Sequence, residues 1–229
     1  MASSLYYNQL SQNVLKSRHH LLDMLEDRGF ETKDYRQFNQ TMINVMLNSS
    51  NKIKDSPEIG PLDILLQQKD SKNKEKCFVK YKLDKFKQSK SLNTFINTIF
   101  ENIIEKNDTL IIITISKVLF KNPKENILEK YINDFFVDNG YFIQFFGIEN
   151  LLFNVSKHIT VPKHKKLNQE EINTMLKNNN TDSIQKLPTI RREDPMAKYI
   201  GMRPDDVCQI TKKSVSAGIY VSYRRCTPN

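Results

Sequence analysis

Residues with chemically reactive side chains are scattered thinly along this sequence. His158 and His164 lie close together, but the three cysteines, Cys77, Cys208 and Cys226, show no paired spacing. A zinc site needs clustered ligands and a disulfide framework needs paired cysteines, so we predict neither a metal site nor disulfides. We expect both histidines to be structural, and the cysteine pattern favours a reducing compartment.

Two acidic pairs could perform acid–base chemistry if burial separated their pKa values. Glu193-Asp194 and Asp205-Asp206 each lie beside a proline, which is typical of turns and helix caps, so we predict structural roles for both. Asp63, followed by Lys80 and Lys82, faintly matches the carboxylate–lysine cluster of a small nuclease, although such spacing is common by chance. A nuclease therefore stays an alternative.

Other motifs of enzymes are missing from the sequence. Its six glycines form neither a phosphate-binding loop nor a Gly-x-Ser-x-Gly elbow. No cluster of aspartates matches the metal-binding loop that two-metal phosphoryl transfer requires. We therefore predict no catalytic residue, no cofactor and no independent enzymatic activity.

Positive charge is concentrated toward the C-terminus of a chain whose net charge is +9. Residues 151–229 hold 14 Lys/Arg against 7 Asp/Glu, whereas residues 1–150 hold 21 against 19. The basic tail indicates either a nucleic-acid or acidic protein partner, or a solvated basic surface. No apolar run approaches the roughly 20 residues that span a membrane, and the N-terminus does not resemble a secretory signal.

The elements that would position these residues begin with helices. Helical spacing from Leu15 to Glu26 predicts a helix that ends at Gly29. A second helix is predicted over Asp34–Leu47, with one apolar side. The residues expected on that side are Tyr35, Phe38, Met42, Val45 and Met46.

The middle of the chain alternates between strand and helix patterns. Strands are predicted at 62–66, 77–81, 110–115 and 141–146, and helices over 92–104 and from Asn122-Pro123 onward. This order predicts a mixed α/β layer across residues 60–146, with the earlier helices packed on it. We expect a domain boundary near residues 147–154.

The last 75 residues hold five of the eight prolines and only short elements. Asn168 is predicted to begin a helix, and Val207–Thr211 and Ile219–Tyr223 are predicted to pair as strands. The fold class predicted for the whole chain is therefore α+β. An N-terminal α/β domain with helices on a mixed sheet precedes a small C-terminal α+β module.

The segment from His158 to Arg224 carries a series of motifs in a particular order. In that order and at nearly the same spacing, they resemble the fifth-largest subunit of eukaryotic-type DNA-dependent RNA polymerases and its short archaeal counterpart, which consists of the C-terminal module alone. We read Asp206 as replacing a glycine of the family pattern, and Val215 as replacing an acidic residue. The resembling segments are His158–His164, Leu167–Glu171, Gln185–Ile190, Asp194–Gly201, Arg203–Val207 and Ser214–Arg224.

The resemblance implies a division of labour between two domains. Residues 1–150 would form a jaw near downstream DNA, and residues 151–229 an assembly module that docks on the largest polymerase subunit, among other subunits. The loop after the third strand, carrying Lys117, Lys121 and Lys124, would approach downstream duplex through phosphate contacts without reading sequence. Its alternative role is a plain connector that caps a helix.

Aromatic and arginine side chains of the module are the expected docking residues, since such side chains often dominate interfaces. Tyr220 and Tyr223 should lie on opposite faces of their strand. The resemblance further implies a monomeric, membrane-free protein of the nucleus, or of a virion and host cytoplasm if its source is viral. A free-standing basic nucleic-acid-binding transcription regulator is the alternative function. The predicted docking residues are Tyr199, Arg203, Tyr220, Tyr223 and Arg224.

Overall fold

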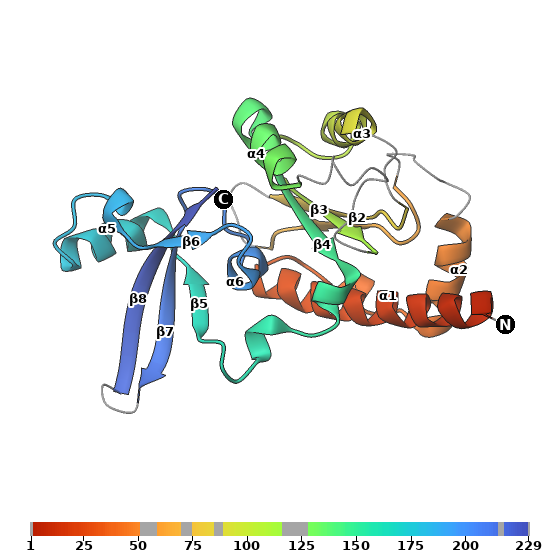
Figure 1. Cartoon of the computed structure of the whole chain (residues 1–229), viewed down its shortest axis with the longest axis horizontal. Coiled ribbons are helices and arrows are strands. Elements are labelled where there is room, and N and C mark those ends of the chain that lie inside the picture. The colour runs from red at the N-terminus through yellow and green to blue at the C-terminus, as the bar shows by residue number, and fades with distance from the viewer. Residues whose placement is uncertain are drawn as a thin grey trace. The chain divides into compact units, whose positions relative to one another are not determined.

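A computed structural model describes residues 2–50, 59–69, 75–84, 89–115, 128–214 and 218–228. The chain divides into two compact units, Met1–Phe153 and Asn154–Asn229, whose elements are labelled in Figure 1. One carries helices on a mixed sheet and the other is a small α+β unit, which confirms the predicted fold class. Separate jaw and assembly roles for residues 1–150 and 151–229 stay a prediction.

The N-terminal unit is built on a sheet with the strand order β1-β2-β3-β4. The first pair is antiparallel and the other two pairs are parallel. Parallel neighbours need a crossover, and α3 and α4 supply it. The elements are α1 (Ala2–Asp27), η1 (Lys33–Tyr35), α2 (Gln40–Ser50), β1 (Ile64–Gln67), β2 (Lys76–Tyr81), α3 (Ser89–Asn102), β3 (Thr109–Thr114), α4 (Leu128–Asn139), β4 (Phe142–Gly147) and η3 (Ile148–Leu151).

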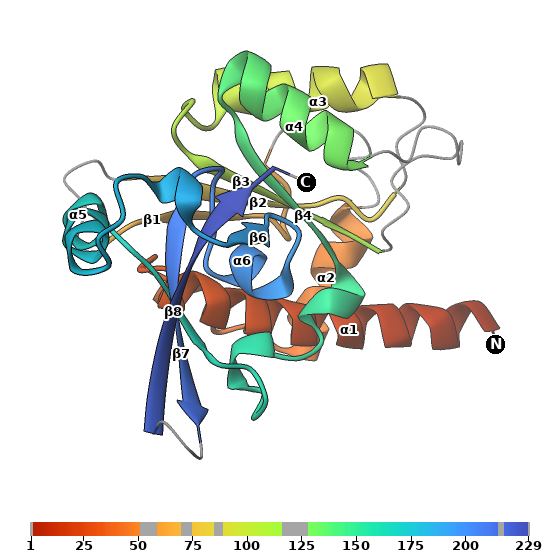
Figure 2. The ribbon, with the colours of Figure 1, turned by 60° about the vertical axis from the view of Figure 1, so that its left-hand side comes forward.

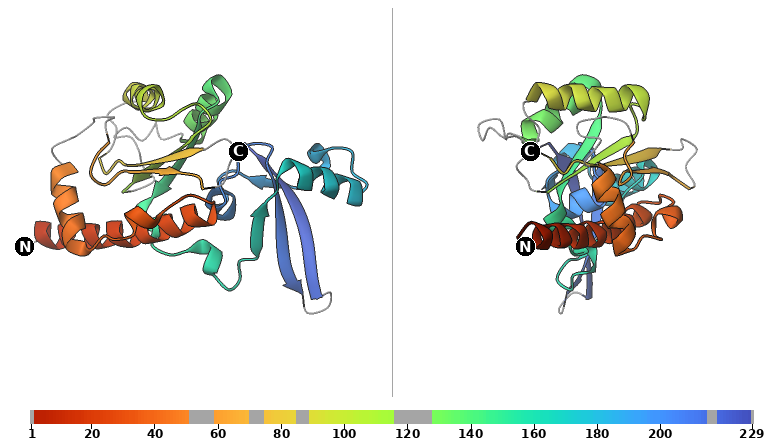
Figure 3. Two further views of the ribbon diagram at one scale, coloured as in Figure 1. Left: turned by 180° about the vertical axis from the view of Figure 1, so that it is seen from behind. Right: turned by 90° about the vertical axis from the view of Figure 1, so that its right-hand side faces the viewer.

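Helices cover both faces of this sheet. Figures 1 and 3 show α3 and α4 on one side of it and α1 on the other. Every residue of β3 and β4 is buried. For β3 this confirms the prediction from the apolar run Leu110–Ile115, which is typical of a strand covered on both faces. The core under α3 and α4 contains Phe78, Leu92, Phe95, Ile96, Ile99, Phe100, Ile104, Leu110, Ile112, Ile132, Phe135, Ile143 and Phe145.

The first helix ends at the predicted glycine. The amide of Gly29 donates to the Glu26 carbonyl and that of Phe30 donates to the Leu25 carbonyl, which is the pairing of a Schellman motif. Gly29 has φ +92°, a left-handed conformation that costs other residues free energy. Leu25 and Phe30 are both buried, so the cap also fixes an apolar contact at the turn.

The second helix differs from its prediction over Asp34–Leu47. The segment begins with a single 3-10 turn at Lys33–Tyr35, and α2 starts only at Gln40. The side chain of Asn39 accepts from the Met42 amide at 2.9 Å and so caps the helix. The predicted apolar side is also wrong, because Met42 and Val45 are exposed while Ile43 and Leu47 are buried.

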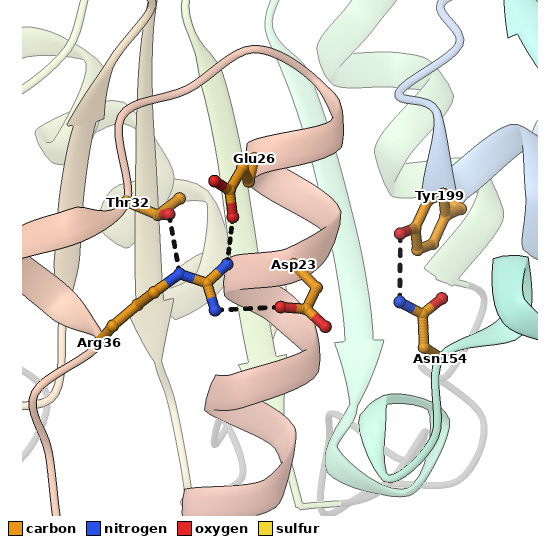
Figure 4. Close-up of polar contacts among 6 residues, drawn as sticks. All are labelled: Asp23, Glu26, Thr32, Arg36, Asn154 and Tyr199. Carbon is orange, nitrogen blue, oxygen red and sulfur yellow. Dashed lines mark hydrogen bonds and ion pairs between the residues drawn. The ribbon is translucent and has the colours of Figure 1, made fainter.

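Tertiary contacts explain why the chain leaves the helical path after residue 35. The guanidinium of Arg36 donates to Thr32 and pairs with Asp23 at 3.0 Å and with Glu26, both on α1 (Figure 4). Phe38 lies against the guanidinium of Arg18, 4.5 Å from ring centroid to Cζ. These contacts join the segment to α1 and outweigh the local helical pattern.

The C-terminal unit is built on a second sheet with the strand order β5-β7-β8-β6. The β6–β8 pair is parallel and the other two pairs are antiparallel. The hairpin of β7 and β8 confirms the predicted pairing of 207–211 with 219–223. The elements are η4 (Val155–Lys157), β5 (Lys163–Lys166), α5 (Gln169–Asn178), η5 (Ile184–Lys186), β6 (Thr189–Arg191), α6 (Pro195–Tyr199), β7 (Val207–Ser214) and β8 (Gly218–Thr227).

Two small cores stabilise this second sheet. One contains Ile172 and Met175 of α5 with Val207 of β7. The other contains Ala197 of α6 with Cys208 of β7 and residues of β6 and β8. Each core covers only part of the hairpin, which matters for the surface of β8 described below.

Side-chain caps begin both helices of the C-terminal unit. Asn168 and Glu171 form a reciprocal capping box at the start of α5, as the sequence predicts. Asp194 accepts from the amides of Met196 and Ala197 and so caps α6, whose first residue is Pro195. The acidic pair Glu193-Asp194 thus has the structural role expected of it.

The turn before β7 corrects one detail of the sequence interpretation. We assigned the replaced glycine to Asp206, but the residue with the left-handed backbone that glycine favours is Asp205, at φ +69°. The Asp206 carboxylate instead accepts from the Arg203 amide at 2.6 Å and pairs with Lys166 at 2.6 Å. The strained position in this turn is therefore one residue earlier than predicted.

Candidate functional site

The predicted docking residues of the C-terminal unit differ widely in exposure. Tyr199 ends α6 and is only 8% exposed. Its hydroxyl oxygen accepts from the Asn154 side-chain amide at 3.3 Å (Figure 4). Arg203 is half-buried in the turn that precedes β7. Both residues lie within the packing of their own unit, so any role they have at a docking surface includes fixing its shape.

The other three predicted docking residues lie on β8. Tyr220 is 55% exposed, whereas Tyr223 packs partly buried beside the core under α5. Arg224 is exposed, and its guanidinium donates to the Thr189 carbonyl at 2.9 Å. Tyr220 and Tyr223 therefore point to opposite faces, as an odd separation along a strand requires. The structure does not gather the five residues on one face, and their role in docking stays a prediction.

The predicted DNA-proximal lysines Lys117, Lys121 and Lys124 lie outside the described residues. What precedes them is described, because β3 ends at Thr114, fully within the buried sheet. Their approach to downstream duplex therefore stays a prediction from sequence.

The two histidines each have a local hydrogen-bond partner. A ring nitrogen of His158 lies 2.8 Å from the Thr160 hydroxyl, and one of His164 lies 2.7 Å from the Pro162 carbonyl oxygen. Among the described residues, no group of three or more His, Cys, Asp or Glu side chains could hold a metal ion. In the same parts of the chain, no helix is long and apolar enough to span a membrane.

Asp63 and Lys80, two of the three residues in the faint nuclease pattern, form a buried ion pair in the N-terminal unit. Lys80 Nζ lies 2.8 Å from Asp63 Oδ2, which also accepts from the Gly60 amide, while Oδ1 accepts from the Tyr81 amide. Burial raises the pKa of the Asp63 carboxyl, although Lys80 and the two amides oppose that shift. Both carboxylate oxygens are thus occupied within the protein, which favours a structural pair over a metal-binding nuclease site.

Sequence reasoning missed Arg18, a cation on the first helix that is only 2% exposed. Its guanidinium donates to the Leu62 carbonyl at 2.7 Å and packs on the Phe38 ring. Burial lowers its pKa, but arginine stays protonated at any ordinary pH. The sequence held a signal for this, because Arg18 lies at helical spacing from the apolar residues Val14, Leu21, Leu22 and Leu25. All four of these residues are buried in the same helix.

The three cysteines are buried free thiols. Burial raises the pKa of Cys77 to about 12. The same cause raises the pKa of Cys208 to about 11 and that of Cys226 to about 12. At neutral pH they remain protonated and behave as small apolar core residues.

Comparisons with known proteins agree on the C-terminal unit. The family model described as "RNA polymerase Rpb5, C-terminal domain" matches residues 153–226. DNA-directed RNA polymerase subunit Rpo5 of Pyrococcus horikoshii is 40% identical over 72 residues, 31% of this chain and 87% of that protein. Rpo5 of Archaeoglobus fulgidus is 44% identical over 72 residues, 31% of this chain and 93% of that protein.

A plant relative also matches. DNA-directed RNA polymerases IV and V subunit 5B of Arabidopsis thaliana is 37% identical over 82 residues, 36% of this chain and 37% of that protein. With the archaeal proteins covered almost completely, the class of protein is defined by this module. The chain belongs to the family of Rpb5 and Rpo5 RNA polymerase subunits.

Proposed function

We propose that this protein is a non-catalytic subunit of a multisubunit DNA-directed RNA polymerase. The observation that carries the proposal is the 44% identity to a polymerase subunit of which 93% is matched. A free-standing transcription regulator is not favoured, because the relatives are named as polymerase subunits. The role places the protein in the transcription machinery inside the cell; a nuclear or a viral setting would both suit it.

The proposed division of labour follows the two units. Residues 154–229 dock on the largest subunit and contact other subunits, and the N-terminal unit forms a jaw beside downstream duplex DNA. Support for docking through the C-terminal unit comes from its excess of basic over acidic residues, 14 against 7 within residues 151–229. Such an excess suits an acidic partner surface.

Affinity purification of the tagged full-length protein from native material tests the proposed function. We expect two very large polymerase chains to purify with it in moderate salt. The purified protein alone should be monomeric and should not synthesise RNA on a template. A protein that purifies without large chains yet binds DNA stably by itself would instead support the regulator.

The proposed DNA contact is tested by replacing Lys117, Lys121 and Lys124 with serine in the assembled polymerase. Each lost phosphate contact should reduce the logarithmic salt slope of DNA binding by about 0.9, whatever the sequence of the duplex. Subunit assembly should be unchanged. Absence of crosslinks from this loop to downstream DNA, together with unchanged complex lifetimes, would make the loop a connector.

A further inference from the structure

The outer half of the β7–β8 hairpin extends past its neighbouring strands. β5 pairs with β7 only over Cys208–Thr211, and β6 pairs with β8 only over Arg225–Thr227. The hairpin continues beyond both, to the pair Ser214–Gly218. Figures 1 and 2 show it leaving the rest of the C-terminal unit as a two-stranded ribbon. Such ribbons are marginally stable alone in water, so a further strand would stabilise this one.

Hydrogen bonds at the C-terminal end of β8 show which way the backbone N–H and C=O groups of this strand point. The Arg225 amide donates outward, to the Pro188 carbonyl at 2.9 Å, whereas the Cys226 amide donates to Asp206 at 2.8 Å, on the β7 side. The register with β7 is continuous from Val207 to Ser214, so this alternation runs the length of the hairpin. The residues that turn their N–H and C=O groups outward, where no other described strand pairs with them, are Ile219, Val221 and Tyr223.

We call these three residues the free edge of β8. Along the outward side of β8, the neighbouring chain begins at Pro188, just before β6, and the residues preceding Pro188 form the 3-10 turn η5 rather than a strand. The vacant part, from residue 219 to residue 223, is about 17 Å long at the usual rise of a strand. That length suits an added strand of ordinary size.

The side chains around the free edge indicate what kind of strand would fit. Ile219 is 71% exposed, Tyr220 is 55% exposed and Val221 is 38% exposed, so apolar surface is open on both faces of the ribbon. Lys212 and Lys213, opposite Tyr220 and Ile219 on β7, are exposed as well. An acidic strand with alternating apolar side chains complements this surface, whereas a second copy of the same basic hairpin would oppose its own lysines.

We propose that the free edge of β8 accepts an extended acidic segment of the largest polymerase subunit as an added β-strand. The proposal rests on the proposed function, since it names the means by which the C-terminal unit holds its partner. Backbone hydrogen bonds would give the contact its strength, and Ile219, Val221 and Tyr220 would select the side chains of the incoming strand.

Amide hydrogen exchange with residue-level fragmentation tests the proposal directly. In the free full-length protein, the outward amides of Ile219, Val221 and Tyr223 should exchange fast, while those of Tyr220 and Ser222, which pair with β7, should be protected. In the complex purified with the largest subunit, the three outward amides should slow by at least about tenfold, with the inward ones unchanged.

A substitution separates backbone pairing from side-chain contact. Val221→Pro removes one outward donor and leaves pairing with β7 possible, because its N–H faces away from that strand. We expect it to shorten the lifetime of the complex by about tenfold, whereas the matched control Val221→Thr changes it by less than about twofold. Protected amides at Tyr220 and Ser222 in the free variant would verify that the hairpin still folds.

A charge-reversal pair tests the acidic character of the partner. Lys212→Glu with Lys213→Glu should weaken retention of the largest subunit, and the weakening should shrink in high salt. The control Lys163→Glu with Lys177→Glu makes the same charge change elsewhere on the unit and should have little effect.

The outcomes distinguish the two proposals. If no large chain purifies with the wild-type protein, the proposed function fails. If large chains purify but the outward amides exchange as fast as in the free protein, the function stands and the added strand is overturned. Protection that develops in the pure protein at high concentration, with dimers in sedimentation, would overturn it in favour of a second copy.

Discussion

The two sheets of this protein differ in how completely their own units bury them. In the N-terminal unit, β3 and β4 are buried at every residue and lie between helices on both faces. In the C-terminal unit, the first four residues of β8 are exposed, and the strand is covered only toward its end. The first sheet is covered by helices of its own unit, whereas the second leaves an edge and apolar side chains available to a partner.

This difference bears on which part of the sequence is recognisable. A buried apolar layer tolerates many volume-conserving exchanges, so residues such as Ile111 and Ile112 carry little family-specific information. Turns, caps and docking surfaces restrict residue types more strongly, as Asn168 and Asp194 illustrate. The family match over residues 153–226 lies in the unit that is rich in such features.

The largest effect expected from a single substitution is in the N-terminal unit, whose sheet is the more completely buried. Lys80→Met leaves the buried Asp63 carboxylate without its cation, which should cost about 3–5 kcal/mol in the free energy of unfolding. Urea denaturation followed by circular dichroism measures it. The double variant Asp63→Asn with Lys80→Met should recover most of the loss, because the pair then leaves no unpaired carboxylate behind. Equal losses in the single and double variants would contradict the argument.

The pH dependence of the same variant follows from the raised pKa of Asp63. A raised folded pKa means that the native state binds more protons than the unfolded state in the window above the ordinary value of 3.8. The contribution of Asp63 to stability is therefore greatest below this window and falls as the pH rises through it. In Lys80→Met the fall should be larger and extend to higher pH, since the opposing cation is gone. A pH-independent deficit would contradict this assignment.

A second change tests the left-handed cap of α1. Gly29→Ala should destabilise the N-terminal unit by about 1–2 kcal/mol through backbone strain. Steric contact is not the cause, because the nearest atom to the added Cβ would be a Gln68 side-chain atom at 3.7 Å. Gly29→Asn, in which asparagine tolerates this conformation better, should cost less than Gly29→Ala when both variants are measured by thermal unfolding. An equal or larger cost for Asn would point away from strain.

The capping box of α5 provides the corresponding test in the C-terminal unit. Asn168→Ala removes the acceptor for the Glu171 amide and should cost about 1 kcal/mol. Amide exchange within α5 should quicken accordingly, while exchange in β3 and β4 stays as it was. Asn168→Asp keeps an acceptor and serves as the control. Faster exchange in both units would show that they do not unfold independently.

The smallest expected effect is a gain in stability. Asp205→Gly should relieve the left-handed strain at φ +69°. The substitution also removes the ion pair between Asp205 and Arg225, which offsets part of the gain. That offset is small, because the Asp205 side chain is 60% exposed. The net increase should be at most about 1 kcal/mol. Asp206→Gly should instead destabilise the turn, because Asp206 binds the Arg203 amide. The reverse order in thermal unfolding would restore the sequence-based assignment.

Local patterns sufficed where a single element carries its own signal. The stripe Leu92–Ile104 and the apolar run Leu110–Ile115 predicted α3 and β3 correctly. Pairing of β5 was missed because Lys163–Lys166 contains no apolar residue and is a strand only through its neighbour β7. The break before α2 depends on Arg18 and α1, which no local pattern contains. The free edge of β8 was missed for the same reason, since it depends on where β6 stops.

The buried cysteines have a practical consequence for labelling. With pKa values raised to about 12, 11 and 12, Cys77, Cys208 and Cys226 should react slowly with maleimides while the protein is folded. A cysteine placed at the exposed Ile219 would therefore accept a fluorophore selectively, without removal of any native thiol. The rate at which the three native thiols become alkylated would then report how often each unit opens, since a buried thiol reacts only while the structure around it is open.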